Sequence, residues 1–427
     1  MLKTGEKIYD FATELFPICR SITGQGVKDT LQLIQKKVKR LSIKSVPSGY
    51  QAFDWVVPRE WNIYEAYLED GKKNRIIDFR DNNLHVMSYS MPLDVFGKKE
   101  NLRKYIITNP EYPNAIPYAT SYYKEKSSLC MSQNQFDLLK DDEEYHIVIR
   151  SSLQDGELNY GEIYIPGKIK KEILISTYIC HPSMANNEVS GPSVATYLAK
   201  YLLNRENYYS YRIIFCPETI GAITFLSKNL EYLKENVVSG FVLTCVGDNN
   251  NYSFVQTRYG DTLTDKLLDH VLKFQGENYK KYSFLQRGSD ERQYCAPNVD
   301  LPVCTVCRTK FHEYPEYHSS NDDLTLISPE GLYGTYELLI RCINILECNK
   351  KYRVQVCCEP QLGKRGLYQN VGMNVPYGGV KGMLDFIAYA DGKNDLIDIG
   401  NIIEVPAWEL IEYVKVLNEH NLLGENT

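Results

Sequence analysis

The sequence predicts an α/β protein built on a mixed, mostly parallel sheet flanked by helices. Apolar strand-like runs alternate with helical patterns between residues 145 and 349. Short alternating runs broken by prolines occupy residues 51–130, and three short helical patterns fill residues 350–427. Continuous apolar strands separated by helices are typical of strands covered on both faces. The other two segments indicate an inserted β-rich domain and a small helical domain.

The 427 residues are enough for two or three domains. Hydrophobic residues make up 43% and charged residues 24%, which excludes disordered and fibrous proteins. The net charge of −6 gives no basic surface for a polyanion, so we expect no nucleic-acid substrate. No apolar stretch approaches the length of a signal sequence core or a membrane span, so we expect no membrane span and a cytoplasmic protein.

The α/β domain is predicted to comprise residues 1–50 and 131–349. Apolar stripes from Ile8 to Leu15 and from Val27 to Ile34 predict two helices, followed by the strand LSIKSV. Runs such as RIIDF and LHVMSYS predict that residues 51–130 form the inserted β-rich domain, which could roof the site or form an assembly surface.

The second half of the α/β domain alternates regularly. YHIVIR and LNYGEIYIPG predict a strand pair, and EILISTYIC, RIIFC, FVLTCVG, YSFVQT and LPVCTV predict further strands. Helices are expected over residues 190–203, 220–233, 262–274 and 329–346.

The last segment, residues 350–427, is predicted to be a winged-helix-like domain. It holds eight Lys or Arg and ten Asp or Glu, a net charge of −2. Winged helices that bind DNA are usually basic. We therefore expect this domain to contact another protein. That protein could be a second copy of the same chain, which would make a homo-oligomer.

Polar side chains follow the predicted strands where each strand ends. His181 directly follows EILISTYIC, Glu218 follows RIIFC, and Asp248 follows FVLTCVG. Because ligands bind beyond the carboxyl ends of parallel strands, these side chains are expected at one edge of the sheet. The loop after LPVCTV adds further zinc-type ligands: His312, Glu313, Glu316, His318, Asp322 and Asp323. Two interpretations explain the pattern. The residues form a metal or catalytic site, or they are ordinary solvated residues of loops.

Several longer runs resemble one protein family. ILISTYICHPSMANNEVSG, PETIGAITFL, LTCVGD, GSDERQYCAP and EYPEYHSSNDDL resemble the aminopeptidase-like proteins of bacterial surface-polysaccharide gene clusters, which are relatives of the di-zinc aminopeptidases. LFPICRSITGQGVKDTL, FDWVVPREWNI and the tail from EPQLGKRGLY resemble the same family. The resemblance implies a zinc-aminopeptidase-like core, an inserted β-domain and a C-terminal winged helix.

The resemblance also implies site residues. His181 and His318 match the first and last zinc-binding histidines, and Glu218 matches the general base. Asn187 stands where the metal-bridging carboxylate is expected, and Thr219 stands where a ligand Glu is expected.

The remaining ligand is displaced. Asp248 follows the right strand, but Cys245 occupies the register of the usual ligand. Two zinc ions need a bridging anion to offset their repulsion, and an amide supplies only a dipole. We therefore expect one zinc ion, held by His181, His318 and either Asp248 or Glu218.

The expected function is an aminopeptidase-like metallohydrolase that cleaves an amide bond next to a free amine in surface-polysaccharide metabolism. Its substrate would be a small peptide or an amino-acyl or amino-sugar compound, bound by residues from the set Asp290, Glu291, Arg292, Glu313 and Glu316. The alternative is a degenerate, non-catalytic module that binds an amino-acid group, an amino-sugar group or a protein partner. Asn187 and Thr219 favour the alternative, whereas Glu218 and the two histidines favour an enzyme.

Overall fold

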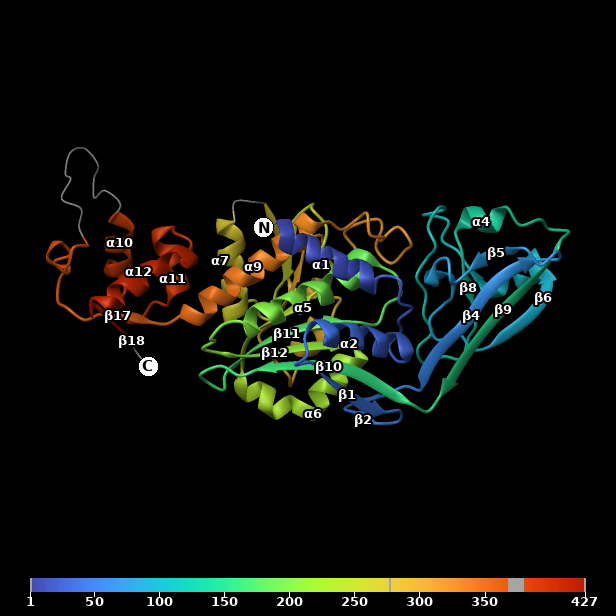
Figure 1. Ribbon diagram of the computed structural model, residues 1–427, viewed down its shortest axis with the longest axis horizontal. Helices are drawn as coiled ribbons and strands as arrows, with labels where there is room; N and C mark the ends of the chain where they lie inside the picture. The colour runs from blue at the N-terminus through green and yellow to red at the C-terminus, as the bar shows by residue number, and fades with distance from the viewer. Residues whose placement is uncertain (1, 276–277, 368–379, 426–427) are drawn as a thin grey trace. The chain divides into compact units, whose positions relative to one another are not determined.

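The computed structural model describes residues 2–275, 278–367 and 380–425 (Figure 1). The chain divides into two compact units. The first comprises Met1–Gly260 and Lys280–Tyr336, and the second comprises Asp261–Tyr279 and Glu337–Thr427. Each unit is described by itself.

The first unit contains an eight-stranded sheet in the order β1-β10-β12-β11-β13-β16-β14-β15. Its four central strands, β12, β11, β13 and β16, are parallel, whereas β1, β10 and β14 pair in the antiparallel sense. The predicted mixed, mostly parallel sheet is therefore confirmed. The strands are β1 (Ser42–Pro47), β10 (Glu157–Ile165), β11 (Glu172–Tyr178), β12 (Ser210–Cys216), β13 (Val237–Leu243), β14 (Tyr252–Val255), β15 (Tyr279–Tyr282) and β16 (Val303–Cys307).

Amphipathic helices cover this sheet. In α2, buried side chains recur at helical spacing through Val27, Leu31 and Ile34, so one face of the helix is apolar. Helix α5 packs against β11 and β12, α6 packs against β10, and α1 packs against α5. The bounds are α1 (Leu2–Leu15), α2 (Gln25–Lys37), α5 (Ser190–Leu203), α6 (Ile220–Asn236), α8 (Glu291–Tyr294) and α9 (Pro329–Cys348).

A second sheet of four strands has the order β5-β4-β9-β6. Its strands are β4 (Glu60–Asp70), β5 (Arg75–Asp78), β6 (Leu93–Lys98) and β9 (Glu144–Gln154). The shorter elements nearby are β2 (Gln51–Ala52), β3 (Trp55–Val56), β7 (Ile106–Ile107), β8 (Leu129–Cys130), α3 (Lys99–Leu102), α4 (Gln133–Asp137), η1 (Asn83–His85) and η2 (Arg103–Tyr105).

The predicted strand pair YHIVIR and LNYGEIYIPG is wrong. These segments form β9 and β10, but β9 pairs with β4 and β6, whereas β10 pairs with β1 and β12. The chain passes from the small sheet to the large sheet between Gln154 and Glu157. An alternating pattern predicts a strand but does not identify its partner, and two adjacent strands need not form a hairpin.

The second unit combines helix α7 with three C-terminal helices and a strand pair that have the architecture of a winged helix. It contains α7 (Leu263–Phe274), α10 (Lys381–Tyr389), α11 (Leu396–Ile403) and α12 (Ala407–Glu419), and β17 (Tyr352–Val354) pairs antiparallel with β18 (Leu423–Glu425). Lys266 forms an ion pair with Asp395, the N-cap residue of α11, at 2.8 Å. The predicted winged-helix domain is confirmed.

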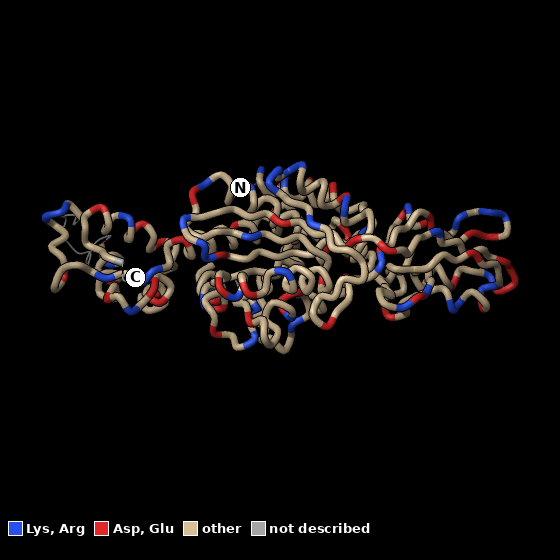
Figure 2. Tube along the Cα trace, turned by 90° about the horizontal axis from the view of Figure 1, so that it is seen from below, with Lys and Arg blue, Asp and Glu red and all other residues tan. Residues whose placement is uncertain are grey.

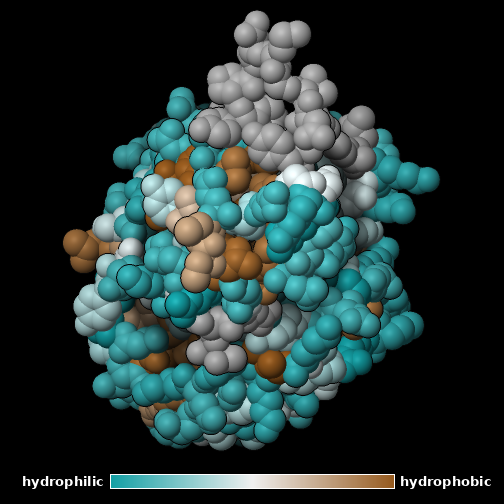
Figure 3. Space-filling view, turned by 90° about the vertical axis from the view of Figure 1, so that its left-hand side faces the viewer, coloured by the Kyte–Doolittle hydropathy of each residue, from teal (hydrophilic) through white to brown (hydrophobic). Residues whose placement is uncertain are grey.

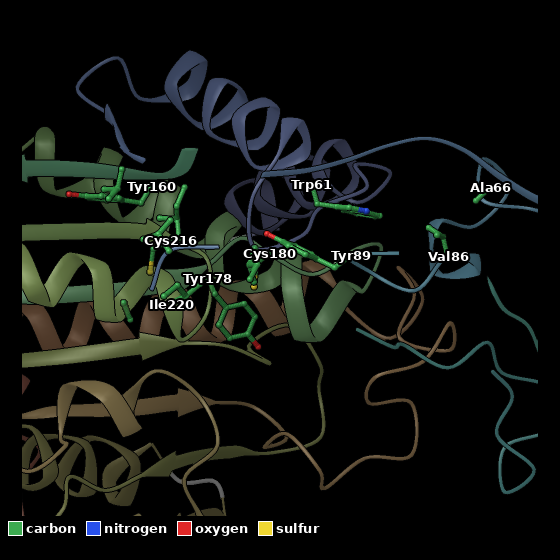
Figure 4. Close-up of a cluster of buried hydrophobic side chains, with 14 of the residues drawn as sticks. Trp61, Ala66, Val86, Tyr89, Tyr160, Tyr178, Cys180, Cys216 and Ile220 are labelled. Carbon is green, nitrogen blue, oxygen red and sulfur yellow. The ribbon is translucent and has the colours of Figure 1, made fainter. Parts of the chain in front are cut away.

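One hydrophobic cluster joins the inserted segment to the large sheet. Ala66 and Val86 come from the inserted segment, whereas Tyr178 and Cys216 come from the ends of β11 and β12 (Figure 4). This packing holds the inserted segment against the carboxyl edge of the sheet.

The surface carries both signs of charge. Lys and Arg alternate with Asp and Glu along the chain (Figure 2), and the face in Figure 3 is mainly hydrophilic with separate small apolar patches. Among the described residues, no helix is both long enough and apolar enough to cross a membrane.

Candidate functional site

His181 and Glu218 meet at the carboxyl edge of the large sheet. His181 follows β11, and Glu218 follows the parallel neighbour β12. The Nε2 atom of His181 lies 3.7 Å from Oε2 of Glu218. The structure thus brings together two side chains that the strand-end pattern predicts to be neighbours.

A buried ion pair orients His181. The His181 Nδ1 atom lies 2.9 Å from Oε2 of Glu188, and Arg20 Nε lies 3.2 Å from Oε1 of the same carboxylate. Arg20 Nε also donates a hydrogen bond to the His181 carbonyl at 2.9 Å. Burial lowers the pKa of His181, but hydrogen bonding and charge attraction to Glu188 outweigh it and raise the pKa overall. A carboxylate on Nδ1 fixes the ring and leaves Nε2 for other chemistry.

Asp322 shapes the turn that carries Glu188. This turn, η3 (Ala185–Val189), is π-helical, and its first three N–H groups donate to the Asp322 carboxylate at 2.6–3.0 Å. Burial raises the pKa of Asp322 to about 7, although these hydrogen bonds oppose the shift. Asp322 belongs to the predicted polar loop after β16, and its observed role is to join that loop to η3.

His318 lies beside His181. The two ring centroids are 5.5 Å apart, and the buried Nε2 of His318 has no hydrogen-bond partner within the described part of the chain. Burial lowers the pKa of His318 to about 2, so its imidazole is neutral at ordinary pH. Tyr317 stacks on the His318 ring at 3.9 Å between centroids.

The inserted segment covers these histidines. The ring of Tyr118 lies edge-on to His181 and His318, at 5.2 and 5.0 Å between centroids. The Tyr118 N–H donates to the His318 carbonyl at 3.0 Å, and Ser320 N–H donates to the Ile116 carbonyl at 2.9 Å. Residues 116–118 therefore form the roof over the histidine pair.

A cavity of about 300 Å³ opens beside Glu218. Its lining includes Glu218, Arg292, Cys180, Trp55 and Tyr123. The pKa of Glu218 is raised overall, mainly by burial and further by the nearby carboxylates. The positive charges of His181 and Arg292 oppose this rise but do not cancel it. A carboxyl group with a raised pKa beside a cavity suits proton transfer.

Asp248 does not point toward this pair of histidines. Its Oδ1 accepts from the Thr309 hydroxyl at 2.7 Å and the Asn250 N–H at 2.9 Å, and its Oδ2 accepts from Thr309 N–H and the Asn186 amide. These four hydrogen bonds tie together the loops after β13 and β16 and the turn η3. The geometry assigns Asp248 a structural role and argues against the predicted ligand role.

The Asn187 amide is held through its nitrogen, while its buried oxygen has no hydrogen-bond partner among the described residues. Its Nδ2 donates to the Tyr178 hydroxyl at 2.7 Å, and the neighbouring Cys245 Sγ lies 3.9 Å from the same nitrogen. Burial raises the pKa of Cys245 to about 12, so this thiol carries no charge at neutral pH. The residues present do not supply the anions that a second zinc ion would need.

The predicted substrate-binding residues separate into three groups. Both oxygens of Glu291 accept hydrogen bonds from Gly288, Ser289 and Thr305, so this carboxylate holds the protein's own loop. Asp290 accepts from the Thr219 N–H at 2.7 Å through one oxygen, while its buried second oxygen has no partner among the described residues. Arg292 donates to the Thr219 hydroxyl and lines the cavity.

The other two predicted residues lie elsewhere on the loop after β16. Glu313 is exposed and lies 3.8 Å from Lys280, and the Glu316 carbonyl accepts from the Ser319 hydroxyl. Neither lines the cavity beside Glu218.

The donor atoms available to a metal can be tested against this geometry. Among the described residues, Cys180, His181 and Glu188 have ligand atoms within 4.8 Å of one another. However, Glu188 is paired with Arg20, and burial raises the pKa of the Cys180 thiol well above its usual value. The donors left are Nε2 of His181, Nε2 of His318 and the Glu218 carboxylate.

Two of these donors belong to neighbouring rings. Zinc–nitrogen bonds are about 2.0–2.1 Å long, and the ring centroids of His181 and His318 are 5.5 Å apart, which suits two imidazoles that share one ion. Within the described residues, however, the ligand atoms of His181, His318 and Glu218 do not all lie within 4.8 Å of one another. Two histidines and a Glu form a known ligand set of catalytic zinc.

Glu188, Arg20 and Tyr118 are site residues that sequence reasoning missed. Arg20 lies in LFPICRSITG and Glu188 in NNEVSG, which are runs that carry the family resemblance. That signal marks the segments, but the pairing of these residues depends on the tertiary structure.

Comparisons with known proteins agree with the fold. The family model of a domain of unknown function, DUF4910, matches residues 9–349, and a winged helix-turn-helix model matches residues 350–425. A Clostridium acetobutylicum protein is 45% identical over 399 residues, which cover 93% of this chain and 91% of the relative. That relative is named as a candidate polysaccharide biosynthesis protein with an aminopeptidase-like domain.

Solved structures are similar as well. The crystal structure of a candidate peptidase from Clostridium acetobutylicum has a TM-score of 0.93 at 42% identity and covers 100% of this chain and 97% of its own. A zinc aminopeptidase from Bacillus subtilis has a TM-score of 0.56 at 15% identity and covers 79% and 94%, which shows a shared fold alone. The predicted resemblance to aminopeptidase-like proteins is confirmed.

Proposed function

Because this chain belongs to the DUF4910 family and has an aminopeptidase-like fold, we propose that it hydrolyses amide bonds with Glu218 as general base and one zinc ion. The observation that carries this proposal is the 3.7 Å approach of His181 Nε2 to Glu218, whose side chain lines a cavity. The proposed zinc ligands are His181 and His318 together with water, and Glu218 acts as the base beside them.

Each residue has a separate part in the proposed reaction. A bound zinc ion would polarise the amide carbonyl and acidify water. Glu218, whose pKa is raised by burial, would take the proton of the attacking water and deliver it to the leaving amine. Glu188 and Arg20 hold the His181 ring, and Tyr118 excludes bulk water from the two imidazoles.

Recognition of a free amine is proposed for Asp290. One of its carboxylate oxygens is buried without a partner among the described residues, and its other oxygen is fixed by Thr219 N–H. Arg292 lines the adjacent cavity and would bind an acidic or carbonyl group of the substrate. The name of the Clostridium acetobutylicum relative supports a substrate from polysaccharide biosynthesis. Within that class we propose an amino-acyl or amino-sugar compound.

The test combines metal content with turnover. Protein purified without chelators should hold about one zinc per chain and release amine from amino-acyl amides or from amino sugars that carry an amino-acyl group. Glu218→Gln should keep zinc and lose turnover by about two to four orders of magnitude, because the base is removed. His181→Ala should lose both zinc and turnover. Glu313→Gln is the matched control, since Glu313 is exposed and outside the cavity.

One observation favours a second candidate, a non-catalytic binding module. Asn187 and Thr219 are neutral where the resemblance implies carboxylates, and Asp248 is fully hydrogen-bonded elsewhere. Wild-type protein that binds no zinc and turns over no substrate, yet binds an amino sugar equally well with and without Glu218→Gln, would support this candidate instead.

A further inference from the structure

We propose that a sugar-binding subsite lies at the mouth of the Glu218 cavity, on the exposed rings of Trp55 and Tyr123. This inference rests on the proposed function, because it assigns the substrate class of the same site. Trp55 is 40% exposed and Tyr123 is 55% exposed, and both line the cavity that contains Glu218 and Arg292. We call this pair of rings the aromatic platform.

The aromatic platform is held in place without a ligand. The two ring centroids are 6.1 Å apart at an interplanar angle of 62°. Trp55 lies in β3, which pairs with β2 as a short hairpin, and the Tyr123 hydroxyl donates to the carbonyl of Val56 at 3.2 Å. Because the rings are fixed in advance, a ligand would lose little affinity to their ordering.

The platform continues into two neighbouring cavities. A cavity of about 310 Å³ includes Trp55 and the exposed Phe53, and one of about 470 Å³ includes Tyr123. The larger one is lined by charged side chains next to aromatic rings: Arg59, Lys124, Glu125 and Asp155, with Tyr89 and Tyr122. Arg59 and Glu125 form an exposed ion pair at 2.6 Å.

This combination of groups fits a sugar ring better than a peptide side chain. The face of a pyranose ring is covered by C–H groups that pack on aromatic rings, and its hydroxyls reach outward to charged side chains. Polar groups that fix a ligand beside aromatic walls are typical of small-molecule sites. An apolar peptide side chain would cover the rings but leave Arg59, Glu125 and Asp155 without new hydrogen bonds. The amide at Glu218 would then belong to an amino sugar whose neighbouring ring lies on the platform.

The test compares an uncharged sugar with a peptide of zero net charge. The probes are the trisaccharide of β1,4-linked N-acetylglucosamine, which carries amide groups, and the dipeptide Leu-Ala, each titrated into the full chain and followed by calorimetry. Trp55→Ala should weaken trisaccharide binding about tenfold, the effect of losing roughly one aromatic contact, and leave dipeptide binding unchanged. Trp55→Phe should restore most of the affinity. Tyr259→Ala removes an exposed ring that lines none of these three cavities and is the control.

The outcomes separate the two proposals. If wild-type protein does not bind the trisaccharide, or if Trp55→Ala weakens both probes equally, the sugar subsite is wrong while amide hydrolysis stands. If zinc and turnover are absent but trisaccharide binding still depends on Trp55, amide hydrolysis is wrong and the subsite stands. The melting temperature of each variant is the control for folding, and an unchanged value shows that the variant is folded.

Discussion

At the scale of single residues, the buried charge of Arg20 determines how His181 can act. Arg20 and Glu188 are each 1% exposed, and burial lowers the pKa of Arg20 against the opposing charge of Glu188. Removing two charges from water is costly, so such a pair adds little net stability. Its observed effect is to present one fixed nitrogen of His181 to Glu218.

Replacing Arg20 tests this arrangement. Arg20→Met leaves Glu188 as an uncompensated buried charge and should lower the free energy of unfolding by about 3–5 kcal/mol. The measurement is urea unfolding followed by circular dichroism. Lys28→Met is the control, because the Lys28–Glu60 pair at 3.1 Å is partly exposed and should be worth less than about 1 kcal/mol. Equal losses for the two variants would contradict the assigned role of Arg20.

The sequence predicts some site residues and misses others for a physical reason. His181, Glu218 and His318 follow strands whose parallel order fixes where their ends meet. Asp248 obeys the same rule, but local N–H and hydroxyl donors occupy its oxygens. Strand position predicts the edge at which a side chain lies, not the hydrogen bonds that it makes there.

At the scale of elements, β9 connects its two neighbours in the small sheet, β4 and β6, through one histidine. His146 on β9 lies 3.0 Å from Glu69 on β4 and 2.8 Å from Asp94 on β6. Burial lowers the pKa of His146, but hydrogen bonds to Asp94 and Glu69 outweigh it, and the pKa is raised overall. Protonated His146 therefore links three strands.

This tie predicts a pH-dependent stability. The pKa of His146 is higher in the folded state than its unfolded value of about 6.5. The stabilisation that protonated His146 gives to the folded state is therefore fully present below about pH 6.5, and it is lost as the pH rises through the folded-state pKa. His146→Asn should lower the melting temperature at pH 5.5 and have a smaller effect at pH 8.5. Calorimetry at the two pH values gives the difference, and a pH-independent effect would argue against the tie.

Helices and strands differ in how far the sequence predicts them. Helix α5 occupies Ser190–Leu203, as its apolar spacing predicts, because helical hydrogen bonds and packing periodicity are local. The pairing of β9 is not local, since its partners β4 and β6 come from the inserted segment.

At the scale of the whole molecule, charge bears on the role of the winged helix. Residues 350–427 carry a net charge of −2, and Figure 2 shows residues of both signs interspersed along the chain. Binding to phosphates depends on clustered Lys and Arg. Contact with a protein, including a second copy of the chain, remains the prediction for this domain.

We expect the full chain to bind duplex DNA weakly. Fluorescence anisotropy with a labelled random duplex at 150 mM salt should give a dissociation constant no tighter than about 10⁻⁴ M, the weak end of non-specific binding. Submicromolar binding that weakens steeply with salt would overturn the prediction. Light scattering on the same sample reports whether the chain forms oligomers.

The fold class and the winged helix could be predicted because each depends on the order and periodicity of elements. The attachment of residues 116–118 to the loop that carries His318 could not. It depends on backbone hydrogen bonds between segments far apart in the chain, which leave no pattern in side-chain type.

That attachment governs how the site opens. Tyr118 N–H is bonded to the carbonyl of His318, and Ser320 N–H is bonded to the carbonyl of Ile116. The two amides face each other across one seam, so neither can exchange its hydrogen with solvent unless the roof and the loop separate. Lifting the roof and exposing the histidine pair are thus a single motion, and the protection of two backbone amides reports its frequency.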